Sequence, residues 1–256
     1  MRWRERDGVR WLEADLDGAG VAFPARVGGV SEPPRHSLNL GLLTGDDPAA
    51  VVENRRRLAA AIGVEPGRVA LARQVHGAEL LEHAQGAGRW LDPDPGAPQA
   101  DGHLLREAGQ AAFCFTADCL PVALCGPGGV ALLHCGWRGL AAGIVARGAA
   151  AVGARAAVVG PGIGPCCYEV GEEVAAEFAD LDGAVARRPG AARPRLDLVA
   201  AARALLAAAG VERVAAAGLC TGCEAELFFS HRRDRGATGR GGALAWLGPR
   251  GGGGEG

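Results

Sequence analysis

Three apolar runs at the centre of the chain constrain its fold more than any other feature. They are AAFCFTADC, PVALCG and VALLHCGW, between residues 111 and 137, and GPGG separates the last two. Short runs without polar alternation are typical of strands that are buried on both faces. The next segment, LAAGIVARGAAAV (140–152), is predicted to be a helix. The pattern therefore predicts a covered sheet in a protein of mixed α and β elements.

The flanking segments predict further elements of both kinds. Two strands within residues 9–28 are joined by the turn DGAG, and a helix capped by Asp46 or Asp47 begins near Pro48 and ends at Gly63. Helices are also expected near 171–180 and 196–209, and strands in AAVV, RVAAAGL and GALAWL. With no repeat or linker evident, we expect residues 1–248 to form a single domain and residues 249–256 a flexible Gly-rich tail.

Charge and composition exclude several classes of protein. The net charge of −2 argues against nucleic-acid binding through a basic surface. No apolar run approaches the ~18 residues of a membrane helix, and MRWRERDGVRW lacks the apolar core of a signal peptide. We therefore expect a cytoplasmic protein without nucleic-acid or membrane partners, taken as a monomer by default. All 27 basic residues are arginine, which excludes P-loop and Schiff-base lysine chemistry.

Two histidines and a cysteine form a candidate metal site. His76, Cys119 and His134 each lie at the end of a predicted strand. Two imidazoles and a thiolate suit zinc or copper, and three protein ligands leave the open position that distinguishes catalytic zinc from structural zinc. The three residues are far apart in the sequence, unlike the tight ligand pairs of a zinc finger. Spacing alone favours separate structural roles over a shared metal.

A series of sequence blocks changes that balance. SLNLG, QVHG, QADG, TADCLPV, HCGWRGLAAGI, GPGIGPCCYEVGEEV, FFSHRRD and TGR occur in this order between residues 37 and 240. The chain resembles the YfiH family, also described as peptidoglycan editing factor, laccase-domain or polyphenol-oxidase-like proteins. The resemblance implies an α+β fold, a four-layer α/β/β/α sandwich with mixed sheets, and metal binding by His76, Cys119 and His134. The chain departs from the family at Cys135, where alanine is usual, and at Cys223, which forms CxxC with Cys220.

The resemblance also implies a choice of activities. These are phosphorolysis of adenosine, inosine and S-methyl-5′-thioadenosine, and deamination of adenosine. Copper-dependent phenol oxidation is an older attribution, and hydrolytic removal of misincorporated amino acids from peptidoglycan precursors is another. We expect a zinc enzyme, with copper as a possible alternative metal, whose partners are a purine nucleoside and phosphate.

Roles for individual residues follow from this chemistry. Zinc lowers the pKa of bound water toward ~7, which suits attack on C6 of adenine with a nearby carboxylate as proton shuttle. Asp101 and Asp118 are the candidate carboxylates. Because neighbours in a strand face opposite ways, Asp118, next to Cys119, is expected to be structural unless the backbone turns there. Cys119, Asp101 and Arg138 form the expected catalytic set.

Substrate contacts are assigned to three polar residues. Arg138 lies beside the start of the helix expected near Gly139, where phosphate would be favoured, although it could equally pair with a carboxylate. Asn39 could bind the ribose or base, or cap its loop. Arg232, in FFSHRRD, is a similar candidate. His36, His83, His103 and His231 have no pairing signal and are treated as non-ligands.

Three alternatives remain open. Laccase chemistry fits poorly because six histidines are too few for a multicopper centre. A metal-free hydrolase would use Cys119 as nucleophile, His134 or His76 as base and Asp101 to orient the base. A non-enzymatic metalloprotein would bind zinc through four cysteines, which are Cys166, Cys167, Cys220 and Cys223. Adjacent cysteines such as Cys166 and Cys167, however, rarely ligate one ion together.

Overall fold

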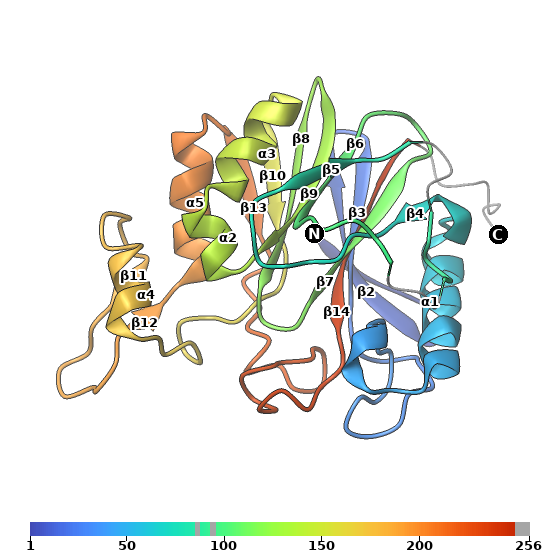
Figure 1. Ribbon diagram of the computed structural model, residues 1–256, viewed down its shortest axis with the longest axis horizontal. Coiled ribbons are helices and arrows are strands. Elements are labelled where there is room, and N and C mark those ends of the chain that lie inside the picture. Colours follow the sequence, from blue (N-terminus) through green and yellow to red (C-terminus); the bar gives the residue numbers. More distant parts are fainter. Residues whose placement is uncertain (85–87, 93–95, 249–256) are drawn as a thin grey trace.

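Two six-stranded sheets pack face to face, with helices on both outer faces. The computed structural model describes residues 1–84, 88–92 and 96–248. In Figure 1, α1 (Pro48–Ile62) lies on one side of the paired sheets, whereas α2 (Trp137–Ala141), α3 (Ile144–Val152) and α5 (Leu198–Ala208) lie on the other. Three separate apolar clusters fill the spaces between these layers. The predicted four-layer α/β/β/α sandwich is confirmed.

The first sheet joins the two ends of the domain. β14 pairs antiparallel with both β3 and β7, so the last strand lies at its centre. α1 packs on its outer face; it begins after Asp47, whose side chain accepts a hydrogen bond from the Ala49 N–H, and ends at Gly63 in the left-handed region. The strand order is β1 (Arg2–Arg6), β2 (Val9–Leu16), β3 (Ala19–Pro24), β14 (Gly241–Leu247), β7 (Ala111–Thr116) and β4 (Val69–Ala70).

The second sheet contains the other two central apolar runs. β8 and β9 form its central hairpin, and α2, α3 and α5 cover its outer face. Its strand order is β13 (Arg213–Ala216), β10 (Ala156–Val159), β8 (Leu120–Gly126), β9 (Gly129–Cys135), β6 (Gly102–Leu105) and β5 (Leu80–Glu82). The smaller elements are η1 (Leu42–Thr44), η2 (Pro66–Arg68), α4 (Glu172–Ala176), β11 (Val185–Ala186) and β12 (Arg195–Leu196).

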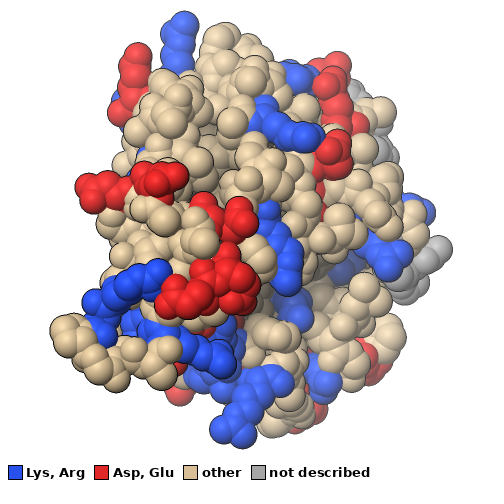
Figure 2. All heavy atoms as spheres, turned by 60° about the vertical axis from the view of Figure 1, so that its left-hand side comes forward, with Lys and Arg blue, Asp and Glu red and all other residues tan. Residues whose placement is uncertain are grey.

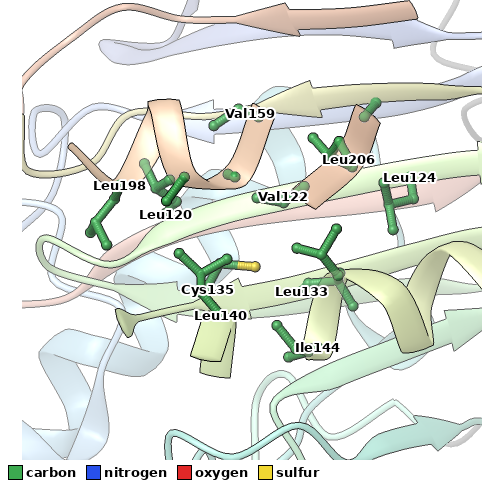
Figure 3. Close-up of a cluster of buried hydrophobic side chains, with 14 of the residues drawn as sticks. Leu120, Val122, Leu124, Leu133, Cys135, Leu140, Ile144, Val159, Leu198 and Leu206 are labelled. Atoms are coloured by element: carbon green, nitrogen blue, oxygen red, sulfur yellow. The ribbon is translucent and has the colours of Figure 1, made fainter. Parts of the chain in front are cut away.

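The central strands are buried on both faces, as predicted. Leu120, Val122 and Leu124 of β8 pack beneath the helices (Figure 3), whereas the intervening Ala123 and Cys125 face the first sheet. Cys135 also lies among the leucine side chains beneath the helices and is fully buried (Figure 3). Its side chain is therefore a small core residue rather than an additional ligand beside His134.

Some elements differ from the sequence prediction. The helix expected over 140–152 is two helices, because Gly143 has φ of 82° and interrupts it. The helix expected over 171–180 covers only residues 172–176, and strand β1, which has a largely exposed polar sequence, was not predicted. The expected tail, 249–256, lies outside the described residues. Among the described helices, none has the length and apolarity needed to span a bilayer.

Two crossings between the sheets determine where the site forms. The chain leaves β4 in the first sheet and enters β5 in the second through residues 71–79. It crosses again from β7 to β8 through residues 117–119. His76 lies in the first crossing and Cys119 in the second. Pro121, at the start of β8, pairs with His134 near the end of β9, so the second crossing lies next to His134.

Candidate metal centre

The three candidate ligands meet at one end of the sandwich. The ligand atoms of His76, Cys119 and His134 all lie within 4.8 Å of one another. The two imidazole rings are 4.8 Å apart between centroids and are inclined at 71°. His134 is buried, Cys119 is half-buried and His76 is exposed, so the group is open to solvent on the His76 side. The fold thus assembles residues that the sequence separates widely.

The Asp101 carboxylate holds the His76 turn and the His134 ring through hydrogen bonds. One carboxylate oxygen accepts hydrogen bonds from the His76 N–H at 2.9 Å and from Nδ1 of His134 at 2.8 Å. The other accepts the N–H groups of Val75 at 3.0 Å and Gly77 at 2.7 Å. These bonds hold the His76 turn, where φ is 62°. Because Nδ1 of His134 donates to Asp101, its Nε2 is left for a metal.

The charges around the candidate metal ligands favour the ionised forms of Cys119 and Asp101. Burial raises the pKa of the Cys119 thiol, but His134 and His76 outweigh burial and bring it to about 6. Burial conversely lowers the pKa of His134, whereas the Cys119 thiolate and Asp101 raise it to about 9. Burial also opposes ionisation of Asp101, but His134 and the backbone N–H groups hold its pKa below the usual value. A thiolate and a carboxylate are thus stabilised around the histidines.

Gly136 provides the space that the group needs. A Cβ atom at this position would lie 2.9 Å from Sγ of Cys119 and 3.4 Å from Cδ2 of His76. A Cβ atom at Gly139 would similarly lie 2.9 Å from the carbonyl oxygen of Gly77, in the His76 turn. The two glycines of HCGWRG therefore allow the segment after β9 to pass directly over the candidate ligands.

Asp118 fastens the Cys119 turn to two neighbouring loops. The residue has φ of 99°, so the backbone does turn here. Its carboxylate accepts hydrogen bonds from Oγ1 of Thr221 and from the Arg232 N–H, both at 2.7 Å. Its carbonyl accepts the Ile163 N–H at 2.7 Å. The side chain is committed to these structural contacts, in keeping with the structural role expected for it.

Tyr168 and Arg232 flank the group on these same loops. The Arg232 guanidinium lies over the Tyr168 ring at 4.9 Å and donates to the Glu169 carbonyl at 2.7 Å. Burial and the negative charge of Cys119 raise the pKa of Tyr168 to about 12, so its hydroxyl keeps its proton at neutral pH. Tyr168 was not selected from the sequence, although it is the single tyrosine of the chain and lies in the GPGIGPCCYEV block.

The other predicted polar residues have different surroundings. Arg138 is exposed and stacks on the Trp137 ring at 4.4 Å. Asn39 is fully buried; its amide nitrogen donates to three acceptors within its own loop, and its oxygen accepts the Arg240 N–H at 2.8 Å. Arg240, which was also not selected, is close enough for the charge of Cys119 to act on its pKa. Asn39 is therefore engaged with its own loop and with the backbone of Arg240.

Two further groups of histidine or cysteine side chains lie outside this centre. His83 and His103, which had no pairing signal, hydrogen-bond to each other at 2.7 Å. The sulfur atoms of Cys166, Cys167, Cys220 and Cys223 also lie within 4.8 Å of one another. Figure 2 shows both acidic and basic side chains on the face that it displays. Ion pairs of the described chain include Arg187–Glu172 and Arg195–Glu169.

The donor set fits a thiophilic divalent ion. His76, Cys119 and His134 supply the imidazole and thiolate ligands that zinc and copper share. Asp101 supplies the carboxylate behind a ligating histidine that is usual at such sites.

Comparisons with known proteins identify the family and agree with the fold. The family model described as multi-copper polyphenol oxidoreductase laccase matches residues 20–248. Purine nucleoside phosphorylase SCO2081 of Streptomyces coelicolor is 41% identical, over 91% of this chain and 97% of its own. Purine nucleoside phosphorylase YlmD of Geobacillus stearothermophilus is 39% identical, over 96% and 97%.

Solved structures give the same result. The crystal structure of YlmD from Geobacillus stearothermophilus matches with a TM-score of 0.86 and 36% identity, over 97% of this chain and 98% of its own. That of YfiH from Bacillus licheniformis matches with a TM-score of 0.86 and 32% identity, over 96% and 98%. The chain therefore belongs to the laccase-like family of YfiH and YlmD proteins.

Proposed function

We propose that this chain is a zinc-dependent purine nucleoside phosphorylase that accepts adenosine, inosine and S-methyl-5′-thioadenosine and also deaminates adenosine. The names of its relatives support the phosphorylase activity. The observation that carries the proposal is the convergence of His76, Cys119 and His134 on one point, with Asp101 behind them.

These three residues would hold the zinc ion. Three protein ligands leave an open position, which is the arrangement of catalytic rather than structural zinc. When bound, zinc supplies Lewis acidity that polarises an oxygen atom or acidifies water. A multicopper oxidase centre is a poor fit because the chain has six histidines, and His83 and His103 are engaged with each other. A single copper ion would still suit the donor set.

The polar residues around the group would bind and orient the substrates. In phosphorolysis, a phosphate oxygen bonds to C1′ of the ribose while the C1′–N9 bond breaks and the base takes up a proton. Arg138 and Arg232 would bind phosphate, and the protonated Tyr168 hydroxyl would donate a hydrogen bond. In deamination, water instead adds at C6 of adenine and ammonia leaves.

Asp101 is better suited to positioning than to proton transfer. Each of its oxygens already accepts two hydrogen bonds from the His76 turn and His134. The proton-shuttle role considered from the sequence would require one of these bonds to break. We assign Asp101 the role of fixing the orientation and tautomer of His134.

The direct test is product analysis with and without phosphate. Purified zinc-loaded protein is incubated with adenosine or inosine, and adenine, hypoxanthine, ribose 1-phosphate and inosine are quantified by chromatography. Bases and ribose 1-phosphate should form only with phosphate, whereas inosine should form from adenosine in its absence. Product levels equal to those of His76→Ala would refute the proposal. His36→Ala is the matched control, since exposed His36 contacts Arg26 through its carbonyl rather than its ring.

The metal-free hydrolase remains a second candidate because of one geometric feature. Cys119, His134 and Asp101 lie in the order of a nucleophile, a base and an orienting carboxylate, with the last two joined at 2.8 Å. This assignment leaves His76 without a chemical role, although the fold holds its turn through three hydrogen bonds. The metal site uses all four residues and is therefore preferred.

Chelation separates the two candidates. A phosphorylase that depends on zinc should lose activity after dialysis against a strong chelator and recover it when zinc is restored. A cysteine hydrolase should keep its activity after chelation and lose it when iodoacetamide modifies Cys119. Peptide mapping would locate the modified residue.

A further inference from the structure

Four cysteines form a second sulfur cluster on two loops. Cys166 and Cys167 lie in the turn that follows β10, and Cys220 and Cys223 lie in the turn that follows β13. All four Sγ atoms lie within 4.8 Å of one another. The adjacent residues Cys166 and Cys167 lie in a turn rather than in a strand, and the Cys167 N–H donates a hydrogen bond to the Gly164 carbonyl. Adjacent side chains in an extended strand face opposite ways and would not bind the same ion. In a turn they can converge, so Cys166 and Cys167 can share one ion.

The sulfur positions suit a common ion better than a pair of disulfides. Sγ of Cys223 lies 3.4 Å from that of Cys166 and 3.5 Å from that of Cys167, so one sulfur is shared between two neighbours. A zinc ion with four sulfur ligands at ~2.3 Å places them about 3.8 Å apart. A disulfide instead selects one partner at ~2.05 Å. All four cysteines are free thiols in the structure.

The surroundings of the cluster resemble those of a built site. Sγ of Cys220 accepts the Gly164 N–H at 3.1 Å, the kind of hydrogen bond that supports a thiolate ligand. A Cβ atom at Gly222 would lie 3.0 Å from Sγ of Cys167, so the glycine leaves room for the sulfur. Cys167 and Cys220 pack against the core, whereas Cys166 and Cys223 are exposed.

Two arginines hold the backbone that bears the cysteines. The guanidinium of Arg195 donates to the carbonyls of Pro165 and Cys166, and that of Arg233 donates to the Thr221 carbonyl at 2.8 Å. The same guanidinium groups pair with Glu169 and Asp234, so they fix the backbone rather than add net positive charge. The cluster therefore has soft ligands, N–H support and a backbone held in place by arginine side chains.

We propose that Cys166, Cys167, Cys220 and Cys223 bind one structural zinc ion, separate from the His76–Cys119–His134 centre. Four protein ligands close the coordination shell, which is the arrangement of structural zinc. The ion would join the loop that bears Tyr168 to the loop that bears Arg232. These residues already stack on each other, and both loops are fastened to Asp118.

The test counts zinc ions per chain in reduced protein after dialysis against a weak chelator. We expect two in the wild type, one in Cys119→Ala, one in Cys166→Ser/Cys223→Ser and none in the combined variant. The double variant changes the two exposed cysteines, and Cys125→Ala, a buried cysteine between the sheets, is the control. If the proposed catalytic zinc fails, the wild type and Cys119→Ala should both still hold one ion.

A second measurement does not depend on variants. Cobalt replaces zinc in the wild type, and four thiolates should give charge-transfer absorption well above that of one thiolate, retained in Cys119→Ala. Alkylation of native protein should modify Cys166 and Cys223 only after zinc is removed. Zinc uptake that is lost with Cys119→Ala and unchanged in the double variant would overturn the proposal. So would a stoichiometric disulfide under reducing purification conditions, or iron in place of zinc.

Discussion

At the scale of single residues, Asp101 has the greatest influence on the candidate metal centre. It accepts four hydrogen bonds, three from the backbone of the His76 turn and one from the His134 ring. A carboxylate can do this because both of its oxygens are acceptors. Asparagine has the same size as aspartate but would direct its NH₂ group toward N–H donors. Replacing Asp101 by asparagine therefore removes the charge and one acceptor without changing the size of the side chain.

Asp101→Asn should weaken both metal binding and the stability of the fold. We expect zinc affinity to fall 10–100-fold, because the orientation of His134 is lost, and unfolding free energy to fall by about 2 kcal/mol, because buried donors lose a charged acceptor. Competitive zinc titration and urea unfolding measure the two effects. Asp180→Asn, at an exposed carboxylate between α4 and β11, is the control. Unchanged affinity in Asp101→Asn would contradict the positioning role.

Gly136→Ala tests the space between the ligands. The added methyl group would lie 2.9 Å from Sγ of Cys119, closer than such contacts allow. We expect zinc affinity to fall at least 10-fold while the far-ultraviolet circular dichroism stays unchanged, because the displaced groups are at the end of the sandwich. Gly67→Ala, where the nearest neighbour would be 3.8 Å away, should bind zinc as the wild type does. Full zinc affinity in Gly136→Ala would show that the segment after β9 can move away from the ligands without weakening zinc binding.

At the scale of elements, β6 links the two sheets through a histidine. Leu104 of β6 packs beneath the helices, so His103 points toward the first sheet, near the backbone of Phe113 in β7. His83 bonds to the same ring. Burial, followed by the charge of His83, lowers the pKa of His103 to about 3, and Asp101 opposes this shift. Both histidines are therefore neutral in the folded protein near neutral pH.

The lowered pKa of His103 predicts how the stability of the protein depends on pH. The unfolded chain binds a proton at His103 below pH ~6.5, whereas the folded chain does so only near pH 3, so stability falls as pH decreases between these values. From pH 7 to pH 5 the loss at this residue should be ~2 kcal/mol. His103→Gln should be less stable than the wild type at pH 7 but should lose less stability on acidification. Urea unfolding at both pH values measures this, and parallel losses in the two proteins would contradict it.

Elements with local signals could be predicted from the sequence, whereas contacts between distant elements could not. Asp47 and Gly63 marked the ends of α1, and continuous apolar runs marked β7, β8 and β9. The break at Gly143 has the weaker signal of a glycine within a helical pattern. The acceptor role of Asp101, which directly precedes β6, depends on how residues 75–77 of the crossing between β4 and β5 approach it, and no local pattern records that distance. The family resemblance, rather than spacing, suggested that the metal ligands meet.

At the scale of the whole molecule, the layers separate stability from site chemistry. The core beneath α1 lies on the outer face of the first sheet. In contrast, His76 and Cys119 lie where the chain crosses between the sheets, next to His134 of β9. Arg55 of α1 is buried in that outer layer and donates to the carbonyls of Leu40 and Trp90, both at 2.9 Å. Its pKa, lowered by burial to about 10, leaves it charged at neutral pH.

Arg55→Met should therefore destabilise the fold without changing the metal centre. Two buried carbonyls would lose their donor, and the stacking of the guanidinium on Trp90 at 5.0 Å would be lost, so we expect a decrease of about 2–4 kcal/mol in unfolding free energy. Zinc affinity measured at 25 °C should match that of the wild type. Arg56→Met removes an exposed neighbour paired with Glu53 and should cost less than about 0.5 kcal/mol. A fall in zinc affinity in Arg55→Met while the protein remains folded would show that the α1 layer and the metal centre are coupled, because the layers would then transmit strain across both sheets.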